Sequence, residues 1–158
     1  MTRNRAVAIV VHNNNLLVMY REEDGKKYYT FPGGGVESGE TAEQAVIREI
    51  DEEATIKISV DRLLYEGKYE NGDTHYFFNC KYISGNPELR ADAIERVQDK
   101  LHNCVHKPEW LALSEVAQAI LYPIPIRDRF IQDMKSPKNG ELATVQLSMT
   151  GNNSSWNC

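Results

Sequence analysis

The side chains best suited to chemistry in this sequence are three closely spaced glutamates, Glu49, Glu52 and Glu53. On a helix, where each residue turns by about 100°, this spacing places all three within an arc of roughly 100°. Carboxylates so close repel one another and raise one another's pKa, which costs stability unless a cation lies among them. An all-oxygen ligand set suits a hard ion such as Mg²⁺ or Mn²⁺ better than zinc. The pattern therefore predicts a metal site.

A glycine-rich loop stands directly before these glutamates. The run Gly33–Gly35 follows Pro32, which ends a short aromatic strand predicted over residues 28–31 because proline cannot donate to a sheet ladder. Three consecutive glycines let the backbone approach a ligand closely or adopt positive φ. The fixed spacing between loop and glutamates indicates that the loop brings a ligand to the metal.

A helix from Thr41 to about Ala54 must position the glutamates. Thr41 is a favourable N-cap, and Gln44 three residues later completes a capping box. The helix also has an apolar stripe beside the acidic face, formed by Val46, Ile47, Ile50 and Ala54. We therefore expect one stripe to pack on a core while the neighbouring face meets a cleft.

Strand patterns dominate the rest of the chain. Ala6–Val11 and Leu16–Tyr20 predict a hairpin, and the pair Asn71-Gly72 predicts a second one. Residues 92–101 suit either a helical turn or a long loop over the site, and an amphipathic helix is expected over Ile126–Met134. We expect residues 1–135 to form a single domain. Residues 136–158 then form a C-terminal tail, in which Leu142–Met149 could add a strand and the last residues should be disordered.

Composition and charge narrow the class of protein. The 158 residues are 41% hydrophobic and 26% charged, as in an ordinary soluble globular protein. The net charge of −5 argues against general attraction to nucleic acid or an anionic membrane. A short apolar run near the N-terminus is too brief for a membrane span or signal peptide. An odd number of cysteines without a CxxC arrangement indicates reduced thiols. We therefore expect a cytoplasmic monomer or homodimer.

The segment from Gly34 to Ile56 resembles the Nudix box of the Nudix hydrolase family, whose pattern is G-x5-E-x7-R-E-U-x-E-E-x-G-U with U aliphatic. Glu40 and Arg48 stand at the required intervals after Gly34. One position departs, because Thr55 stands where the family has glycine. A glycine there usually supplies a left-handed cap that disfavours a β-branched residue. We therefore expect a different helix end or strain at Thr55, with more effect on stability than on chemistry.

The resemblance implies an α/β fold, a Nudix-type α/β/α sandwich with a mixed central sheet. It also implies a MutT-like pyrophosphatase that cleaves a phosphoanhydride bond in a nucleoside diphosphate-linked substrate with Mg²⁺ or Mn²⁺. In the family, Glu40 and Arg48 orient the metal-binding carboxylates. The metal ligands that the family pattern assigns here are Glu49, Glu52, Glu53 and the carbonyl of Gly33.

The base that takes the proton of the attacking water is left open. Glu49 and Glu52 are candidates within the box. Family members often recruit a further acid from a late loop, for which the eligible residues are Asp92, Glu95, Asp99 and Glu109.

Residues for substrate binding are less clearly marked. Arg21, at the end of the second predicted strand, is a candidate for a substrate contact or an ordinary solvent-facing charge. Gly34 and Gly35 are candidates for close backbone approach to the substrate. Three histidines have no partner at metal-ligand spacing and are interpreted as surface or loop residues, namely His12, His102 and His106.

Several substrates fit this prediction: a nucleoside triphosphate, an oxidised nucleotide or ADP-ribose. A catalytically silent module that senses a nucleotide is an alternative of another class, and the intact set of charged box residues argues against it. An RNA 5′-end pyrophosphohydrolase is a further alternative. The acidic balance and the lack of a basic stripe in the sequence argue against it.

Overall fold

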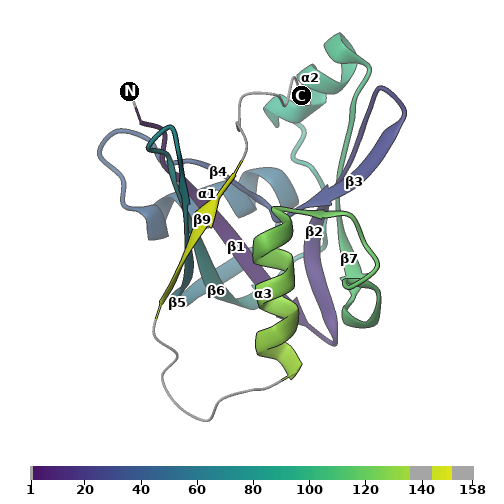
Figure 1. Ribbon diagram of the computed structural model, residues 1–158. Coiled ribbons are helices and arrows are strands. Elements are labelled where there is room, and N and C mark those ends of the chain that lie inside the picture. The colour runs from purple at the N-terminus through teal and green to yellow at the C-terminus, as the bar shows by residue number, and fades with distance from the viewer. Residues whose placement is uncertain (1, 136–143, 151–158) are drawn as a thin grey trace.

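The strand β1 (Arg5–His12) lies at the centre of the fold, in a computed structural model that describes residues 2–135 and 144–150 (Figure 1). In chain order the elements are β1, β2 (Asn15–Glu23), β3 (Lys26–Thr30), β4 (Gly33–Gly35), α1 (Ala42–Ala54), β5 (Lys57–Tyr69), β6 (Thr74–Ser84), α2 (Ile94–His102), β7 (Val105–Ala112), the 3-10 helix η1 (Leu113–Glu115), β8 (Leu121–Tyr122), α3 (Ile124–Lys135) and β9 (Val145–Met149).

The strands form a mixed sheet in the order β8-β3-β2-β1-β6-β5-β9. The strand β1 runs parallel to β6 and antiparallel to β2 and β4, while β7 pairs with β2. Helices α1 and α3 lie on opposite sides of this sheet (Figure 1). The predicted α/β/α sandwich with a mixed central sheet is therefore confirmed.

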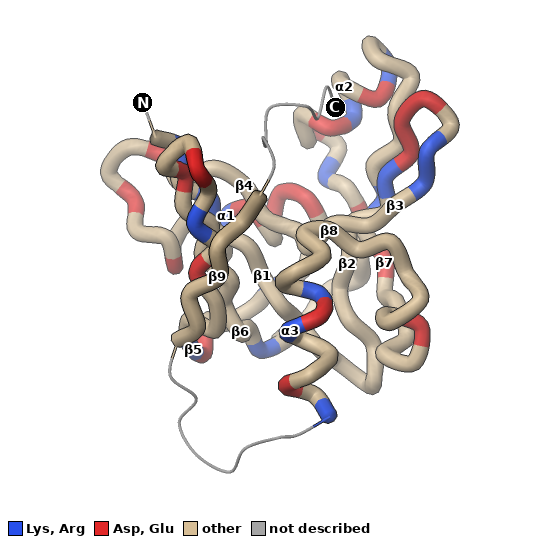
Figure 2. Tube along the Cα trace, viewed as in Figure 1, with Lys and Arg blue, Asp and Glu red and all other residues tan. Residues whose placement is uncertain are grey.

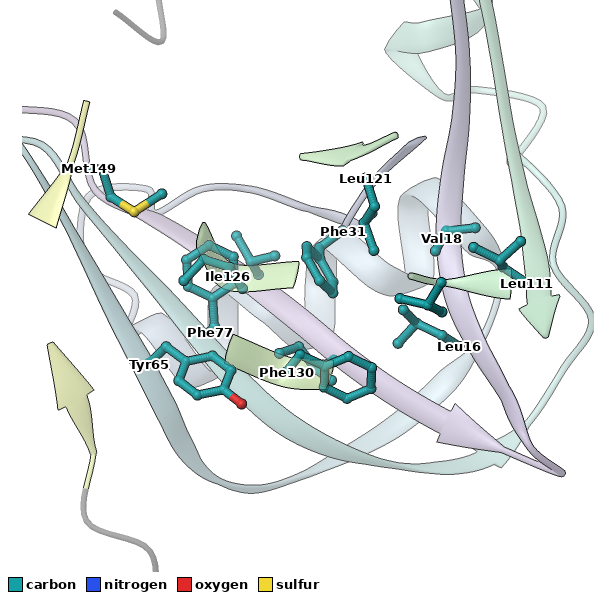
Figure 3. Close-up of a cluster of buried hydrophobic side chains, with 13 residues drawn as sticks. Leu16, Val18, Phe31, Tyr65, Phe77, Leu111, Leu121, Ile126, Phe130 and Met149 are labelled. Atoms are coloured by element: carbon teal, nitrogen blue, oxygen red, sulfur yellow. The ribbon is translucent and has the colours of Figure 1, made fainter. Parts of the chain in front are cut away.

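Alternation along β1 explains how one strand serves two cores. Val7 and Ile9 join a cluster that contains Phe77 of β6 and Phe130 of α3 (Figure 3). The intervening residues, of which Ala8 is one, pack against α1 on the other face. Successive side chains of a strand point to opposite faces, so the continuous apolar run of β1 is buried on both sides.

The helix α1 begins as predicted. Thr41 is its N-cap, and the side chains of Thr41 and Gln44 complete the capping box. The buried stripe consists of Ala45, Val46, Ile50 and Ala54. Ile47 was expected in this stripe but is 43% exposed, because it lies at the edge of the stripe farthest from the glutamates.

Three other segments have a definite structure. The helix α2 (Ile94–His102) covers most of residues 92–101, which were left open between a helical turn and a loop. The helix α3 begins before the predicted start, with Pro125 in its first turn, where a missing N–H leaves no bond unmade. The strand β9 lies within the tail and pairs in parallel with β5, whereas residues 142, 143 and 151–158 lie outside the described residues.

Two cysteines of the described chain differ in oxidation state. Cys80 is buried and free, but Cys104 is disulfide-bonded, so the prediction of reduced thiols is wrong for Cys104. No helix in residues 2–135 and 144–150 has the length and apolar character required to cross a membrane. Cytoplasmic location stays a prediction.

Thr55 closes α1 in the left-handed conformation that usually belongs to glycine. Its φ is 55° and its ψ is 32°, and its backbone N–H donates to the Asp51 carbonyl at 3.2 Å. A β-branched residue is disfavoured there by roughly 1 kcal/mol. The Thr55 hydroxyl offsets this strain, because it donates to the Glu88 carbonyl at 2.5 Å. Of the two predicted outcomes, the structure therefore has strain at Thr55.

Replacing Thr55 by valine should separate these two effects. Thr55→Val keeps the β-branch and the strain but removes the bond to Glu88, so the free energy of unfolding should fall by about 1 kcal/mol. Urea unfolding of the two proteins measures the difference. Thr55→Ser keeps the hydroxyl and should be the more stable variant. Equal stability of Thr55→Val and the wild type would contradict this account.

Candidate active site

The glycine run is a strand, β4, that packs between β1 and α1. Gly33 lies opposite Val7, and Gly35 lies opposite Arg5, in an antiparallel ladder. A Cβ on Gly33 would overlap the Ala6 carbonyl oxygen and Val7 Cα. Glycine at this position therefore lets the loop lie directly against β1 and beside the glutamates of α1.

Glu53 is a half-buried carboxylate of the acidic face. Its Oε2 accepts a hydrogen bond from the Gly33 backbone N–H at 3.0 Å. Burial, followed by the nearby charges of Glu95 and Glu49, raises the pKa of Glu53 to about 8. The nearby charge of Arg5 opposes this rise without cancelling it.

Arg48 gathers the other carboxylates around one guanidinium group. Its Nε and Nη2 donate to the two carboxylate oxygens of Glu40 at 3.2 and 2.6 Å. Its Nη1 lies 2.9 Å from Glu49 Oε1 and 3.5 Å from Glu52 Oε2. Its Nη2 also donates to the Gly35 carbonyl at 3.0 Å. Arg48 thus fixes the loop and the acidic face of α1 relative to each other.

The surroundings of the carboxylates change their pKa values in different directions. The hydrogen bond from Arg48 holds the pKa of Glu40 below its usual value. Burial raises the pKa of Glu49, and the neighbouring Arg48 opposes that shift. The side chain of Glu52 is 44% exposed and faces solvent. The ionised form of Glu40 is therefore favoured by the contact with Arg48, while Glu49 and Glu52 also lie beside the same guanidinium group.

Arg5 of β1 is a site residue that sequence reasoning missed. Its Nη2 donates to the Gly33 carbonyl at 3.0 Å, the same oxygen that was predicted as a metal ligand. Its charge also opposes the raised pKa values of Glu49 and Glu53. Arg5 precedes an apolar strand and carries no motif, so only its register with Gly35 places it here.

The predicted ligands meet at one wall of a cavity. The larger of two adjoining cavities, about 980 Å³, is lined by Gly33, Glu49 and Glu53 among others, and the smaller, about 550 Å³, also by Glu52. No three His, Cys, Asp or Glu side chains among the described residues converge to the spacing of a finished metal site. Oxygen donors beside Glu53, a half-buried carboxylate of raised pKa, nevertheless fit a hard divalent cation.

The four late acids, which were candidates for the general base, have different surroundings in the structure. Asp92 pairs with Arg90 at 2.9 Å, and Glu109 lies 3.4 Å from Lys107. Asp99 is engaged by His106 at 2.6 Å. Glu95 lines both cavities, and its charge acts on Glu53. Asp92 lines the smaller cavity as well, but Glu95 is the late acid that lies at both cavities and acts on Glu53.

Arg21 and His106 lie on the wall of the larger cavity. They are opposite each other in the β2–β7 ladder, and Arg21 Nη2 is 2.5 Å from His106 Nε2. The prediction of a surface or loop histidine is wrong for His106, which is buried. Alternating exposure along β7 places Val105 outward and His106 inward. This two-residue period is the signal that could have predicted the burial of His106.

A protein-family model and a curated relative match large parts of this chain. A family model described as NUDIX domain matches residues 2–134. An RNA pyrophosphohydrolase of Psychromonas ingrahamii is 38% identical over 63 residues, which are 40% of this chain and 35% of that protein. This chain thus spans about a third of the length of that curated relative.

Solved structures give the same fold. A NUDIX hydrolase from Nitrosomonas europaea has a TM-score of 0.71 at 16% identity, over 94% of this chain and 80% of that chain. An ADP-ribose pyrophosphatase from Streptococcus suis 89-1591 has a TM-score of 0.66 at 14% identity, over 92% and 99%. With a family model that covers most of the chain and a box that lies at the cavity wall, the protein belongs to the Nudix family.

Proposed function

We propose that this protein hydrolyses a phosphoanhydride bond in a nucleoside diphosphate-linked substrate, by attack of water at phosphorus. The observation that carries this proposal is the half-buried Glu53, with its raised pKa, beside Glu49 at the wall of a large cavity. Such a carboxylate favours binding of a cation, and a diphosphate is the anion that a bound divalent ion would attract.

Mg²⁺ or Mn²⁺ would be held by the carboxylates of Glu49, Glu52 and Glu53 and by the Gly33 carbonyl. When bound, the ion neutralises the diphosphate and lowers the pKa of a bound water. Arg48 orients Glu49 and Glu52 through its guanidinium fork. Arg5 would have to share or release the Gly33 carbonyl, and its charge would then face the substrate phosphates.

We propose Glu95 as the general base that takes the proton of the attacking water. Its position at both cavities and its influence on Glu53 support this role over Asp99 and Glu109, which are paired elsewhere. Asp92 lines only the smaller cavity and is paired with Arg90 there. Glu49 and Glu52 are already drawn toward Arg48. A carboxylate without such a cationic partner is the better proton acceptor.

Arg21, Gly34 and Gly35 are the proposed substrate contacts. All three line the larger cavity, whose volume of about 980 Å³ suits a ligand of nucleotide size. A small nucleotide is favoured over RNA, because basic and acidic residues are interspersed along the described chain (Figure 2). RNA 5′ ends are the second candidate, which the similarity to an RNA pyrophosphohydrolase supports.

A substrate panel tests the function, and Glu52→Gln tests the metal site. The panel contains a nucleoside triphosphate, an oxidised nucleoside triphosphate, ADP-ribose, a nucleotide sugar and a 5′-triphosphorylated RNA, each with Mg²⁺ or Mn²⁺. Glu52→Gln should lower kcat roughly 100-fold or more, because it removes a metal-binding charge. Glu43→Gln, an exposed position on the same helix, is the matched control. Binding of a nucleotide without any turnover would instead support the silent sensing module.

Gly34→Ala should disturb the site without unfolding the protein. The new methyl group would overlap the carboxylate of Glu49, which is the far end of a flexible side chain and can move aside. We expect kcat/KM to fall roughly 10- to 100-fold, since misplacement by about 1 Å has effects of that size. Gly35→Ala, whose methyl group meets no atom within 4 Å, should lose less. Equal losses in the two variants would contradict this steric account.

The raised pKa of Glu53 predicts the direction of a pH effect on stability without metal. The folded protein holds the Glu53 proton up to about pH 8, whereas the unfolded chain releases it near the usual value of 4.5. The contribution of Glu53 to the free energy of unfolding is therefore present at low pH and lost as pH rises toward 8.

Urea unfolding in EDTA from about pH 5 to about pH 9 measures this effect. Glu53→Gln should remove the pH-dependent part, because it keeps the shape without the titration. Added Mn²⁺ should restore stability to the wild type at high pH and not to Glu53→Gln. Parallel pH profiles of the two proteins in EDTA would refute the assignment.

A further inference from the structure

The helix α2 (Ile94–His102) carries Glu95 but has little apolar attachment to the sheet. None of its residues is buried, and Ile94, Val97 and Leu101 are 65%, 55% and 72% exposed. In Figure 1 the helix projects beyond the central sheet. Polar contacts must therefore fix the position of this helix and of Glu95.

Arg96 ties α2 to the preceding segment through the carbonyls of Leu89 and Arg90. Asp99 makes the contacts to the sheet, with the buried His106 of β7. The side chain of His106 is 1% exposed. Asp99 Oδ1 lies 2.6 Å from His106 Nδ1, and Asp99 Oδ2 accepts the backbone N–H of His106 at 3.1 Å. Both oxygens of one carboxylate thus hold α2 to a single residue of the sheet. Bonds of this kind to a charged group are stronger than neutral ones.

The hydrogen bonds of the His106 ring follow from its surroundings. Burial lowers the pKa of His106, so the ring is neutral. A carboxylate only accepts hydrogen bonds, which places the ring proton on Nδ1 and leaves Nε2 as the acceptor. Nε2 accepts from Nη2 of Arg21 at 2.5 Å. A single chain of hydrogen bonds therefore runs from α2 through β7 to β2. Arg21 donates to His106 Nε2, and His106 Nδ1 donates to Asp99.

We propose that Asp99, His106 and Arg21 form a latch that positions Glu95 in the active site. Glu95 is four residues before Asp99, so both lie on the same side of α2, about one turn apart. Fixing Asp99 on the sheet fixes Glu95 at the cavity wall beside Glu53. His106 is a positioning residue, and the inference rests on the proposed function through the role of Glu95.

A double-mutant cycle between His106 and Glu95 tests the latch. Rates are measured with the compound of the panel that the wild type hydrolyses fastest. His106→Leu should lower kcat roughly 10- to 100-fold, because Glu95 is misplaced. In the Glu95→Gln background the same change should lower kcat no further, since its effect passes through Glu95. An equal loss in both backgrounds, or an unchanged kcat in Glu95→Gln, would overturn the proposal.

Rescue by a conservative variant separates positioning from simple loss of packing. In His106→Asn the side-chain amide nitrogen replaces Nδ1 and can donate to Asp99, although the bond from Arg21 is lost. It should therefore recover most of the kcat that His106→Leu loses, while KM reports the loss of the bond between Arg21 and His106. His102→Asn, an exposed position on α2, should leave kcat unchanged. A kcat for His106→Asn as low as that of His106→Leu would contradict the latch.

Amide hydrogen exchange on the full chain supplies a readout that needs no turnover. His106→Leu and Asp99→Asn should increase exchange of the α2 amides about tenfold or more, while the β1 amides keep their wild-type rates. Asp99→Asn serves if His106→Leu does not fold. Unchanged α2 exchange would refute the latch. An inactive wild type whose α2 exchange still rises in the variants would retain the latch and refute the proposed function.

Discussion

The guanidinium group of Arg48 is the interaction on which the active-site wall depends. Its donors reach Glu40, Glu49, Glu52 and the Gly35 carbonyl, so it joins the glycine strand to the acidic face of α1. Without that charge, the carboxylates would repel one another along a single face. A planar fork with five donors can serve several oxygens at fixed angles, which the compact ammonium of lysine cannot do.

The parts of the site that could be predicted from the sequence are those encoded locally. The capping box at Thr41 and the spacing of the glutamates lie within one helix, where sequence distance translates directly into geometry. Fold and family followed from the same segment, because its pattern of charges and glycines is so specific. Strain at Thr55 could also be foreseen, since a left-handed cap has known preferences.

The parts that could not be predicted depend on register and packing between distant segments. Arg5 reaches the Gly33 carbonyl only because β1 pairs with β4, and His106 is buried because β7 pairs with β2 beneath α2. The choice of Glu95 among the late acids likewise required the placement of α2. The alternating period of β7 is a local signal for the burial of His106. The contacts themselves have none, because they depend on pairing between separate segments of the chain.

The active-site wall is built on two parts of the fold with very different anchoring. The glycine strand lies against β1, which also pairs with β2 and β6 and contributes to both cores. The helix α2 has no buried residue of its own. Local opening of α2 therefore requires far less free energy than opening of the glutamate face. We expect a partly open state in which the carboxylates keep their geometry while α2 is displaced, and in which the products of the proposed hydrolysis can leave.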